Sequence, residues 1–485
     1  MLFITNMQFP SFFARPPMRA FFYLDGLEVL TFAPYTGGYS FVAGCTMKTI
    51  ESLLHPDWII CVDDENRVLK DHSLAIDDGK IIDILPTAEA DQAYTAEHTH
   101  ILTGHALIPG LINSHTHASM NLFRGLADDL PLMQWLEQHI WPAEQKWVSR
   151  DFVRDGARLA IAEMLRGGTT CFNDMYFFPD VVAEQAKQAG IRASIGLIVI
   201  DFPTVWANNA DEYISKGLQL HREIKDERLL STALAPHAPY TVSDAPLAEL
   251  VRLGDEMAIP LHMHIHETPG EIAMAVEQTG LRPLQRLDQL GVLSPRLMAV
   301  HMTQLNNDEI TLLAQRGSHV LHCPESNLKL ASGFCPVQTL LDAGVNVALG
   351  TDGAASNNDL DMLGEMRTAA LLAKAVANDA QAVAAATALR MATINGARAL
   401  GLDAITGSLE EGKAADITAV KLDSLETQPV YDPVSQLVYA AGREHVTHVW
   451  VTGRHLLDNG KLVDMDEAEL LESARSWQQR IADSR

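Results

Sequence analysis

The chain has 485 residues, of which 47% are hydrophobic and 20% charged, and its formal net charge is −26. This length can bury one large core or two to three ordinary ones, and the composition is that of a globular protein. A strongly acidic surface repels phosphate backbones, which argues against nucleic acid as a partner. No apolar run approaches the ~20 residues that a membrane span needs, so we expect no membrane partner.

Residues 1–46 are rich in Phe, Pro and Gly, and their apolar residues follow no steady period. They lack the basic start and clean apolar stretch of a signal peptide. We predict that this segment is a non-core extension, and we take Met47 as the hypothetical native start.

The cysteines are scattered without CxxC spacing, which predicts reduced thiols in a cytoplasmic protein rather than a disulfide framework. The five are Cys45, Cys61, Cys171, Cys323 and Cys335.

Both ends of the remaining chain are rich in predicted strands. Residues 57–62 and 73–85 are predicted strands, the second folding back at the turn signal Asp77-Asp78-Gly79-Lys80. Residues 415–420 and 448–451 follow the central region, with a turn near Asn459-Gly460. We predict that residues 47–106 and 407–485 pair into one small discontinuous β-sandwich, the second part ending in a helix.

Residues 107–406 alternate short apolar strands with amphipathic helical stretches such as residues 151–166 and 180–188. Eight β-then-α units in this space predict an α/β fold, a (β/α)8 barrel of the TIM type. The predicted strands are residues 107–113, 168–173, 192–200, 230–236, 259–265, 297–302, 319–323 and 345–350.

Polar and titratable residues follow each of these predicted strands. Because such barrels place reactive side chains at the carboxyl ends of their strands, we expect these residues to converge. In chain order they are His115 and His117; Asn173 and Asp174; Asp201; His237; His262, His264, His266 and Glu267; His301; His322 through Asn327; and Asp352.

His115 and His117 are spaced i, i+2, so on an extended chain both imidazoles point to the same side. Imidazoles with one carboxylate and a position left for water suit a borderline ion such as Zn²⁺. The H-x-E…P-C-x-x-C pattern of cytidine-type zinc deaminases is absent. The predicted strand at residues 230–236 also offers no lysine that could be carbamylated to bridge two metal ions. We therefore expect one divalent metal ion per subunit, with Zn²⁺ preferred.

Several motifs together resemble the amidohydrolase superfamily. They are Pro-Gly-Leu-Ile-Asn-Ser-His-Thr-His at residues 109–117, His-Ile-His-Glu-Thr at residues 264–268, His301, and Gly350-Thr351-Asp352-Gly353. Residues 407–416 resemble the point where the barrel of that superfamily returns to its β-sandwich. Within it the chain is most similar to the 5-methylthioadenosine/S-adenosylhomocysteine deaminases, through residues 123–132, 135–144 and 237–243. The resemblance covers about residues 50–460.

The resemblance implies a role for each of eight site residues. It makes His115, His117, His264 and Asp352 the metal ligands, Glu267 the acid that meets the heterocycle, and His301 and Asp352 the groups beside the attacking water. Glu144 and His237 contact the nucleoside together with Glu267 and Asp352, and Glu144 accepts from the ribose hydroxyls. His264 is preferred to His262 and His266 only because of the His-x-x-Glu spacing, so a slip by two residues stays open.

The implied reaction is hydrolytic deamination of 5′-methylthioadenosine, S-adenosylhomocysteine or adenosine by attack of metal-bound hydroxide at C6. It yields the inosine analogue and ammonia. We expect Met120, Phe123, Trp135 and Trp141 to offer apolar surface to the purine or a thioether. The alternatives are a guanine or triazine deaminase or hydrolase of the same superfamily, and a catalytically silent barrel used for binding. The sequence leaves open the 5′ substituent and whether the chain forms a homo-oligomer.

Overall fold

The computed structural model describes residues 47–483. The predicted extension at residues 1–46 and the hypothetical start at Met47 therefore concern residues that lie outside, or at the edge of, the described chain. Among the described helices, none is both long enough and apolar enough to cross a membrane.

Eight parallel strands form the first sheet, in the order β13-β12-β11-β10-β9-β8-β7-β6, which confirms the predicted barrel. The strands are buried on both faces, as expected where helices cover the outside and side chains fill the inside. Their bounds are β6 (Leu111–Thr116), β7 (Thr169–Asp174), β8 (Arg192–Val199), β9 (Leu230–Pro236), β10 (Leu261–Ile265), β11 (Leu297–His301), β12 (His319–His322) and β13 (Val347–Leu349).

The predicted helical stretches at residues 151–166 and 180–188 lie in α4 and α5. Side chains cap several of these helices; Ser149, for example, accepts from the amide of Phe152 at the start of α4. The helices between and after the barrel strands are α2 (Leu132–Trp135), α3 (Trp141–Trp147), α4 (Arg150–Arg166), α5 (Pro179–Ala189), α6 (Ala210–Ile224), α7 (Asp244–Met257), α8 (Pro269–Thr279), α9 (Pro283–Gln289), α10 (Asn307–Arg316), α11 (Pro324–Lys329), α12 (Val337–Asp342), α13 (Met362–Ala377), α14 (Ala385–Met391) and α15 (Ile394–Ala399), with the short helices η1 (Ala118–Phe123) and η2 (Leu136–Ile140).

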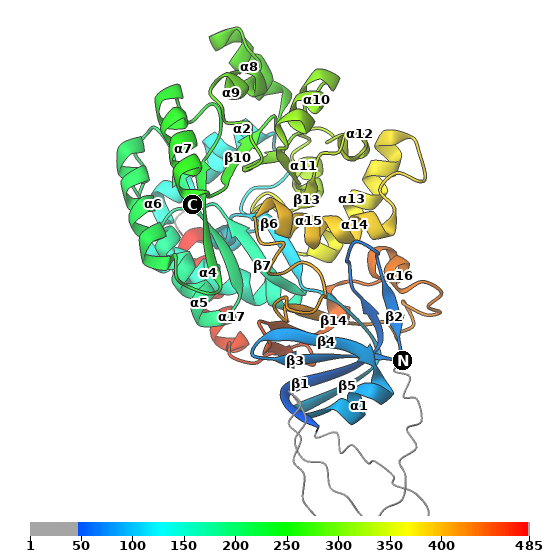
Figure 1. Cartoon of the computed structure of the whole chain (residues 1–485). Coiled ribbons are helices and arrows are strands. Elements are labelled where there is room, and N and C mark those ends of the chain that lie inside the picture. The colour runs from blue at the N-terminus through cyan, green and yellow to red at the C-terminus, as the bar shows by residue number, and fades with distance from the viewer. Residues whose placement is uncertain (1–46, 484–485) are drawn as a thin grey trace, which may run out of the picture. The chain divides into compact units, whose positions relative to one another are not determined.

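The second sheet takes strands from both ends of the described chain, in the order β17-β16-β15-β14-β5-β1-β3-β4, with β2 on β1. In Figure 1 the blue strands β1, β3, β4 and β5 accordingly share this sheet with the orange strand β14. The bounds are β1 (Lys48–Ile60), β2 (Val68–Lys70), β3 (His72–Asp77), β4 (Lys80–Pro86), β5 (Tyr94–Pro109), β14 (Ile417–Lys421), β15 (Val446–Val451), β16 (Arg454–Asp458) and β17 (Lys461–Leu462), and the helices beside it are α1 (Thr87–Ala93), α16 (Pro433–Tyr439), η3 (Arg443–His445) and α17 (Glu467–Ala482).

The two halves of the second sheet meet where β5 pairs with β14, with Leu107 opposite Ala419. The predicted strand at residues 107–113 is divided at Gly110 between β5 of this sheet and β6 of the barrel. The predicted turns at residues 77–80 and 459–460 join β3 to β4 and β16 to β17. A discontinuous β domain beside the barrel is thus confirmed, whereas its limits at residues 106 and 407 stay a prediction.

The end of β13 returns to the end of β6. The amide of Asp352 donates to the carbonyl oxygen of His115 at 3.0 Å, and the amide of Thr351 donates to Asn113 Oδ1 at 3.0 Å. These bonds bring the first and last barrel strands together at their carboxyl ends. Two of the predicted site residues therefore lie at the junction that closes the barrel.

Candidate active site

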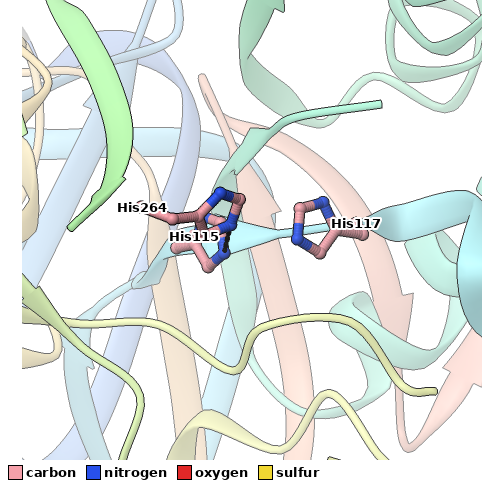
Figure 2. A group of neighbouring side chains, drawn as sticks. All are labelled: His115, His117 and His264. Atoms are coloured by element: carbon pink, nitrogen blue, oxygen red, sulfur yellow. Dashed lines mark hydrogen bonds between the residues drawn. The ribbon is translucent and has the colours of Figure 1, made fainter. Parts of the chain in front are cut away.

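Three imidazoles meet at the carboxyl ends of β6 and β10. Ligand atoms of His115, His117 and His264 all lie within 4.8 Å of one another. The Nε2 atoms of His115 and His264 are 3.2 Å apart, and Figure 2 shows this contact as a dashed line. His115 belongs to β6 and His117 follows that strand by one residue, whereas His264 comes from β10, so the barrel brings together groups far apart in sequence.

Backbone contacts orient two of these rings. Nδ1 of His264 donates to the carbonyl oxygen of His237 at 2.7 Å, and Nδ1 of His117 donates to that of Met175 at 2.5 Å. Each ring therefore presents the lone pair of Nε2 to the cluster, the arrangement typical of metal-bound histidines. Imidazole nitrogens gathered in this way beside the carboxylate of Asp352 form a donor set that fits a metal ion.

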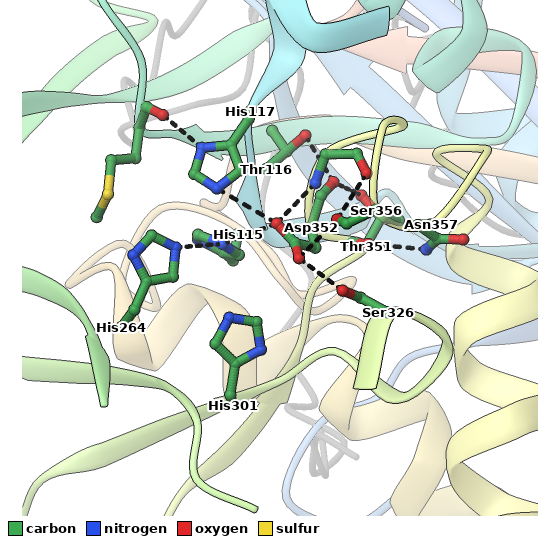
Figure 3. A network of polar contacts seen from close by, with 12 residues as sticks. His115, Thr116, His117, His264, His301, Ser326, Thr351, Asp352, Ser356 and Asn357 are labelled. Atoms are coloured by element: carbon green, nitrogen blue, oxygen red, sulfur yellow. Dashed lines mark hydrogen bonds and ion pairs between the residues drawn. The ribbon is translucent and has the colours of Figure 1, made fainter. Parts of the chain in front are cut away.

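Asp352 supplies the carboxylate of the cluster. Its Oδ1 lies 3.4 Å from Nε2 of His115 and 3.3 Å from Nε2 of His117. Its Oδ2 accepts from the hydroxyls of Ser326 at 2.7 Å and Ser356 at 2.8 Å, as drawn in Figure 3. These two hydroxyls fix the orientation of the carboxylate, so that Oδ1 faces the imidazoles.

The cluster favours positive charge. Burial lowers the pKa of His117, but the hydrogen bond and negative charge of Asp352 outweigh it and raise the pKa to about 9. Burial lowers the pKa of His115 to about 4 and that of His264 well below its usual range. Without a bound ion, the protein thus stabilises positive charge on His117 beside Asp352 while His115 and His264 stay neutral, and a metal cation bound here would take the place of the His117 proton.

His301 and Glu267 lie beside the cluster. Nδ1 of His301 donates to Asn327 Oδ1 at 2.9 Å, which leaves the lone pair on Nε2, 3.8 Å from Glu267 Oε2. The ring of His301 stacks on that of His264, with centroids 5.4 Å apart. Burial, and then the charge of Asp352, raise the pKa of Glu267 to about 8, so its carboxyl group is protonated at neutral pH.

One cavity of about 610 Å³, a size typical of small-molecule sites, is lined by His117, His264, Glu267, His301 and Asp352. Glu144 lies in its wall, where its Oε1 accepts from the hydroxyl of Tyr176 at 2.8 Å. Burial of the carboxyl group raises the pKa of Glu144 to about 7, although part of the residue is open to the cavity. His237 also lines the cavity, and its Nδ1 lies 3.1 Å from Thr241 Oγ1.

Much of the cavity wall is apolar. Met120, Trp135 and Trp141 line it, as the sequence predicts. The prediction for Phe123 is wrong: this ring is fully buried and packs against Phe152, with centroids 4.7 Å apart. The apolar surface comes largely from residues for which the sequence predicts no role, including Leu136, Ile140, Phe177, Ile198, Ile200, Phe202 and Val205.

The structure places the two other histidines of β10 outside the cluster. Nε2 of His262 lies behind His115, 2.8 Å from its Nδ1, whereas Nε2 of His266 accepts from the amide of Leu284 at 3.2 Å. His264 is thus the histidine of this strand that faces the cavity beside His115 and His117.

Several residues that hold the site in place have no role predicted from the sequence. Ser326 and Asn327 follow β12, and their place at a barrel strand end was the available signal. Tyr176 and Glu271 carried no such signal. Glu271, on α8, accepts from the amides of His266 at 3.0 Å and Glu267 at 2.7 Å, and so fixes the turn that carries Glu267.

A family model described as the amidohydrolase family matches residues 106–463. The chain belongs to the amidohydrolase family. A curated relative in this family, the 5-methylthioadenosine/S-adenosylhomocysteine deaminase of Teredinibacter turnerae, is 49% identical over 437 residues, covering 90% of this chain and 99% of the relative.

Two solved structures are similar to this one. A zinc-bound adenosine deaminase from Xanthomonas campestris is 54% identical, with a TM-score of 0.89 over 90% of this chain and 100% of its own. The atrazine chlorohydrolase of Arthrobacter aurescens TC1, complexed with zinc, is 26% identical, with a TM-score of 0.82 over 88% and 99%. These zinc-bound structures, together with the cluster of His115, His117 and His264, support a divalent metal ion in this amidohydrolase.

Proposed function

We propose that this chain is an aminohydrolase that deaminates adenine nucleosides at C6, giving the inosine analogue and ammonia. The observation that carries the proposal is the buried cluster of His115, His117, His264 and Asp352 beside a protonated Glu267 in one cavity. The proposal is also supported by the similar 5-methylthioadenosine/S-adenosylhomocysteine deaminase and by the similar zinc-bound adenosine deaminase. We further propose one catalytic Zn²⁺ ion per subunit, held by these three histidines and Asp352.

Deamination at C6 needs an activated water and a proton for ring N1. A divalent ion at this cluster supplies the positive charge that lets water lose a proton near neutral pH. We assign acceptance of that proton to Asp352, whose carboxylate Ser326 and Ser356 hold in place. His301 presents the lone pair of Nε2 to the same space and can orient the water.

The protonated carboxyl of Glu267 is the donor for N1, since attack at C6 pushes electrons onto that nitrogen. The C6–O bond forms first and gives a tetrahedral carbon. The C6–N bond then breaks as the amine takes up the proton that Asp352 accepted and leaves as ammonia, while the C6–OH proton returns to Glu267 as C6=O forms. The turn fixed by Glu271 holds Glu267 for this transfer. General acid–base catalysis of this kind is typically worth ~10²–10⁴ in rate.

Glu144 and His237 are proposed to bind the sugar. A carboxylate accepts from paired hydroxyls, and the hydroxyl of Tyr176 orients Glu144. The apolar residues Phe202 and Val205 line the cavity yet stay partly exposed, with exposed fractions of 46% and 39%. They suit a 5′-thioether, which gains from apolar contact more than a free 5′-hydroxyl does.

The test is a substrate panel on metal-loaded protein, followed by purine absorbance. We expect turnover of methylthioadenosine, S-adenosylhomocysteine or adenosine, and little with guanine. No spectral change with any adenine nucleoside would refute the proposal. Chelation of the metal should abolish turnover, and addition of Zn²⁺ should restore it.

The sugar contact has its own test. Glu144→Gln should lower kcat/KM for nucleosides by roughly 10- to 100-fold, because a hydrogen bond to a charged group is worth ~1.5–3 kcal/mol. The matched control is Glu137→Gln, a change of an exposed carboxylate on η2 that should leave kcat/KM unaltered. Equal losses in both variants would contradict the assignment.

We also propose that the protein is cytoplasmic and acts without nucleic acid or membrane partners. A homo-oligomer stays a prediction. The cytoplasmic location rests on the scattered cysteines, of which Cys61, Cys171, Cys323 and Cys335 are free and buried.

A further inference from the structure

A second group of metal-ligating side chains lies in the second sheet, outside the active-site cavity. Ligand atoms of His448 on β15 and of His455 and Asp458 on β16 all lie within 4.8 Å of one another. Nδ1 of His448 is 3.2 Å from Nε2 of His455 and 3.3 Å from Oδ1 of Asp458. None of the three lines the cavity that holds Glu267.

A strand irregularity brings these residues to one face. Trp450 pairs with His455 and Val449 pairs with Leu457, so Leu456 is an extra residue in β16. In a regular strand, residues 455 and 458 would point to opposite faces, because side chains alternate. The extra residue cancels that alternation, a known effect of a β-bulge, and places both ligands beside His448.

Two more histidines from β5 surround the group. The ring centroid of His100 lies 5.2 Å from that of His455, and the ring centroid of His105 lies 6.1 Å from that of His448. Nδ1 of His105 contacts the carbonyl oxygen of Thr103, while its Nε2 is buried and has no hydrogen-bond partner. A buried imidazole nitrogen without a partner is unfavourable unless a ligand or ion satisfies it.

The ring of His448 is enclosed, with an exposed fraction of 7%. Asp458 is half exposed and leaves a path for the ion from solvent.

We propose that His448, His455 and Asp458 form a second metal site, separate from the catalytic one, that binds a Zn²⁺ ion. Two imidazoles and one carboxylate suit this borderline ion, whereas Mg²⁺ and Ca²⁺ prefer oxygen ligands. His100 is the nearest additional ligand, on a strand that precedes the barrel. The bound ion links β15 to β16 and stabilises this hairpin, because binding to the folded state alone raises stability.

The test counts ions on the whole, metal-loaded chain after equilibrium dialysis against ZnCl₂. We expect about two Zn²⁺ ions per chain in the natural sequence and about one in the double variant His448→Gln/His455→Gln, with kcat/KM within ~2-fold of the original. Asp352→Ala should show the reverse, keeping the sheet ion and losing the catalytic one. His72→Gln, on β3 of the same sheet, is the matched control and should keep both ions.

His455 stacks on Trp450, with ring centroids 4.5 Å apart, so the double variant can also disturb packing. Asp458→Asn avoids this contact and should weaken the second site by at least ~10-fold while the chain folds as before. A chain that loses all its Zn²⁺ on the change Asp352→Ala, or a double variant that keeps both ions, would overturn the proposal. A single ion that survives Asp352→Ala and is lost in the double variant would instead support the sheet site and contradict the proposed catalytic one.

Discussion

At the scale of single residues, Glu267 illustrates how burial changes the chemistry of a carboxyl group. Its pKa is raised to about 8, first by burial and then by the charge of Asp352. Glu267 and Asp352 follow two different barrel strands, and a carboxyl group held away from water beside another carboxylate is driven toward its neutral form. The support from Glu271 depends on a turn in which His266 has a φ of 56°, and it is visible only in the structure.

The raised pKa predicts the alkaline limit of activity. Glu267 donates a proton only below its pKa, so kcat/KM should fall as the pH rises through about 8. Glu267→Gln should lower kcat by ~10²–10⁴ with the metal content unchanged, and its residual rate should lack this alkaline limb. Normal turnover in the variant, or an alkaline limb that persists in it, would exclude Glu267 as the acid.

At the scale of elements, the contact between the ends of β13 and β6 both closes the barrel and places Asp352 beside His115. The strands approach so closely that a Cβ atom on Gly350 would lie 2.6 Å from the amide nitrogen of His115. Asp352 itself adopts a left-handed φ of 63°, which is uncommon for a residue other than glycine. The close approach of these two strand ends and the geometry of the site are therefore coupled here.

Gly350→Ala should accordingly harm both stability and metal binding. Overpacking of this kind costs ~1–3 kcal/mol, and separation of the two strands moves Asp352 away from the imidazoles. Denaturant unfolding and metal analysis measure the two effects. Gly270→Ala is the matched control, because the nearest atom to its Cβ would be 3.7 Å away and alanine favours helix α8. If both variants behave alike, the close approach has no such effect.

At the scale of the whole described chain, a buried ion pair joins the barrel to the second sheet. Arg192 on β8 donates to Asp416 at 2.8 Å, and the two side chains have exposed fractions of 4% and 0%. Oδ1 of Asp416 also accepts from the amide of Thr452, and the backbone carbonyl oxygen of Asp416 accepts from the amide of Gly110. One residue thus connects the barrel to segments on both sides of it in sequence.

Asp416→Ala should lower the free energy of unfolding by ~3–5 kcal/mol, because it leaves the Arg192 charge buried and unpaired. Asp423→Ala removes the half-exposed pair with Lys421 and should cost at most ~1 kcal/mol. Equilibrium unfolding monitored by circular dichroism gives both values. Similar losses in the two variants would mean that burial of the Arg192–Asp416 pair is not what matters.

The barrel and most of the candidate site could be predicted from the order and spacing of residues along the chain. Strand alternation is local, and barrel strands direct their carboxyl ends to one rim, so His115, His117, His301 and Asp352 could be grouped without coordinates. The choice of His264 over its two neighbours needed the motif as well, since all three share one strand parity.

The residues that orient the site through hydrogen bonds can be identified only in the folded chain. Tyr176 reaches Glu144 and Asn327 reaches His301 from other elements, across 32 and 26 residues of sequence. The same holds for the sheet cluster, where an extra residue in β16 turns Asp458 toward His448. Such contacts depend on packing and register between distant segments, which no local periodicity encodes.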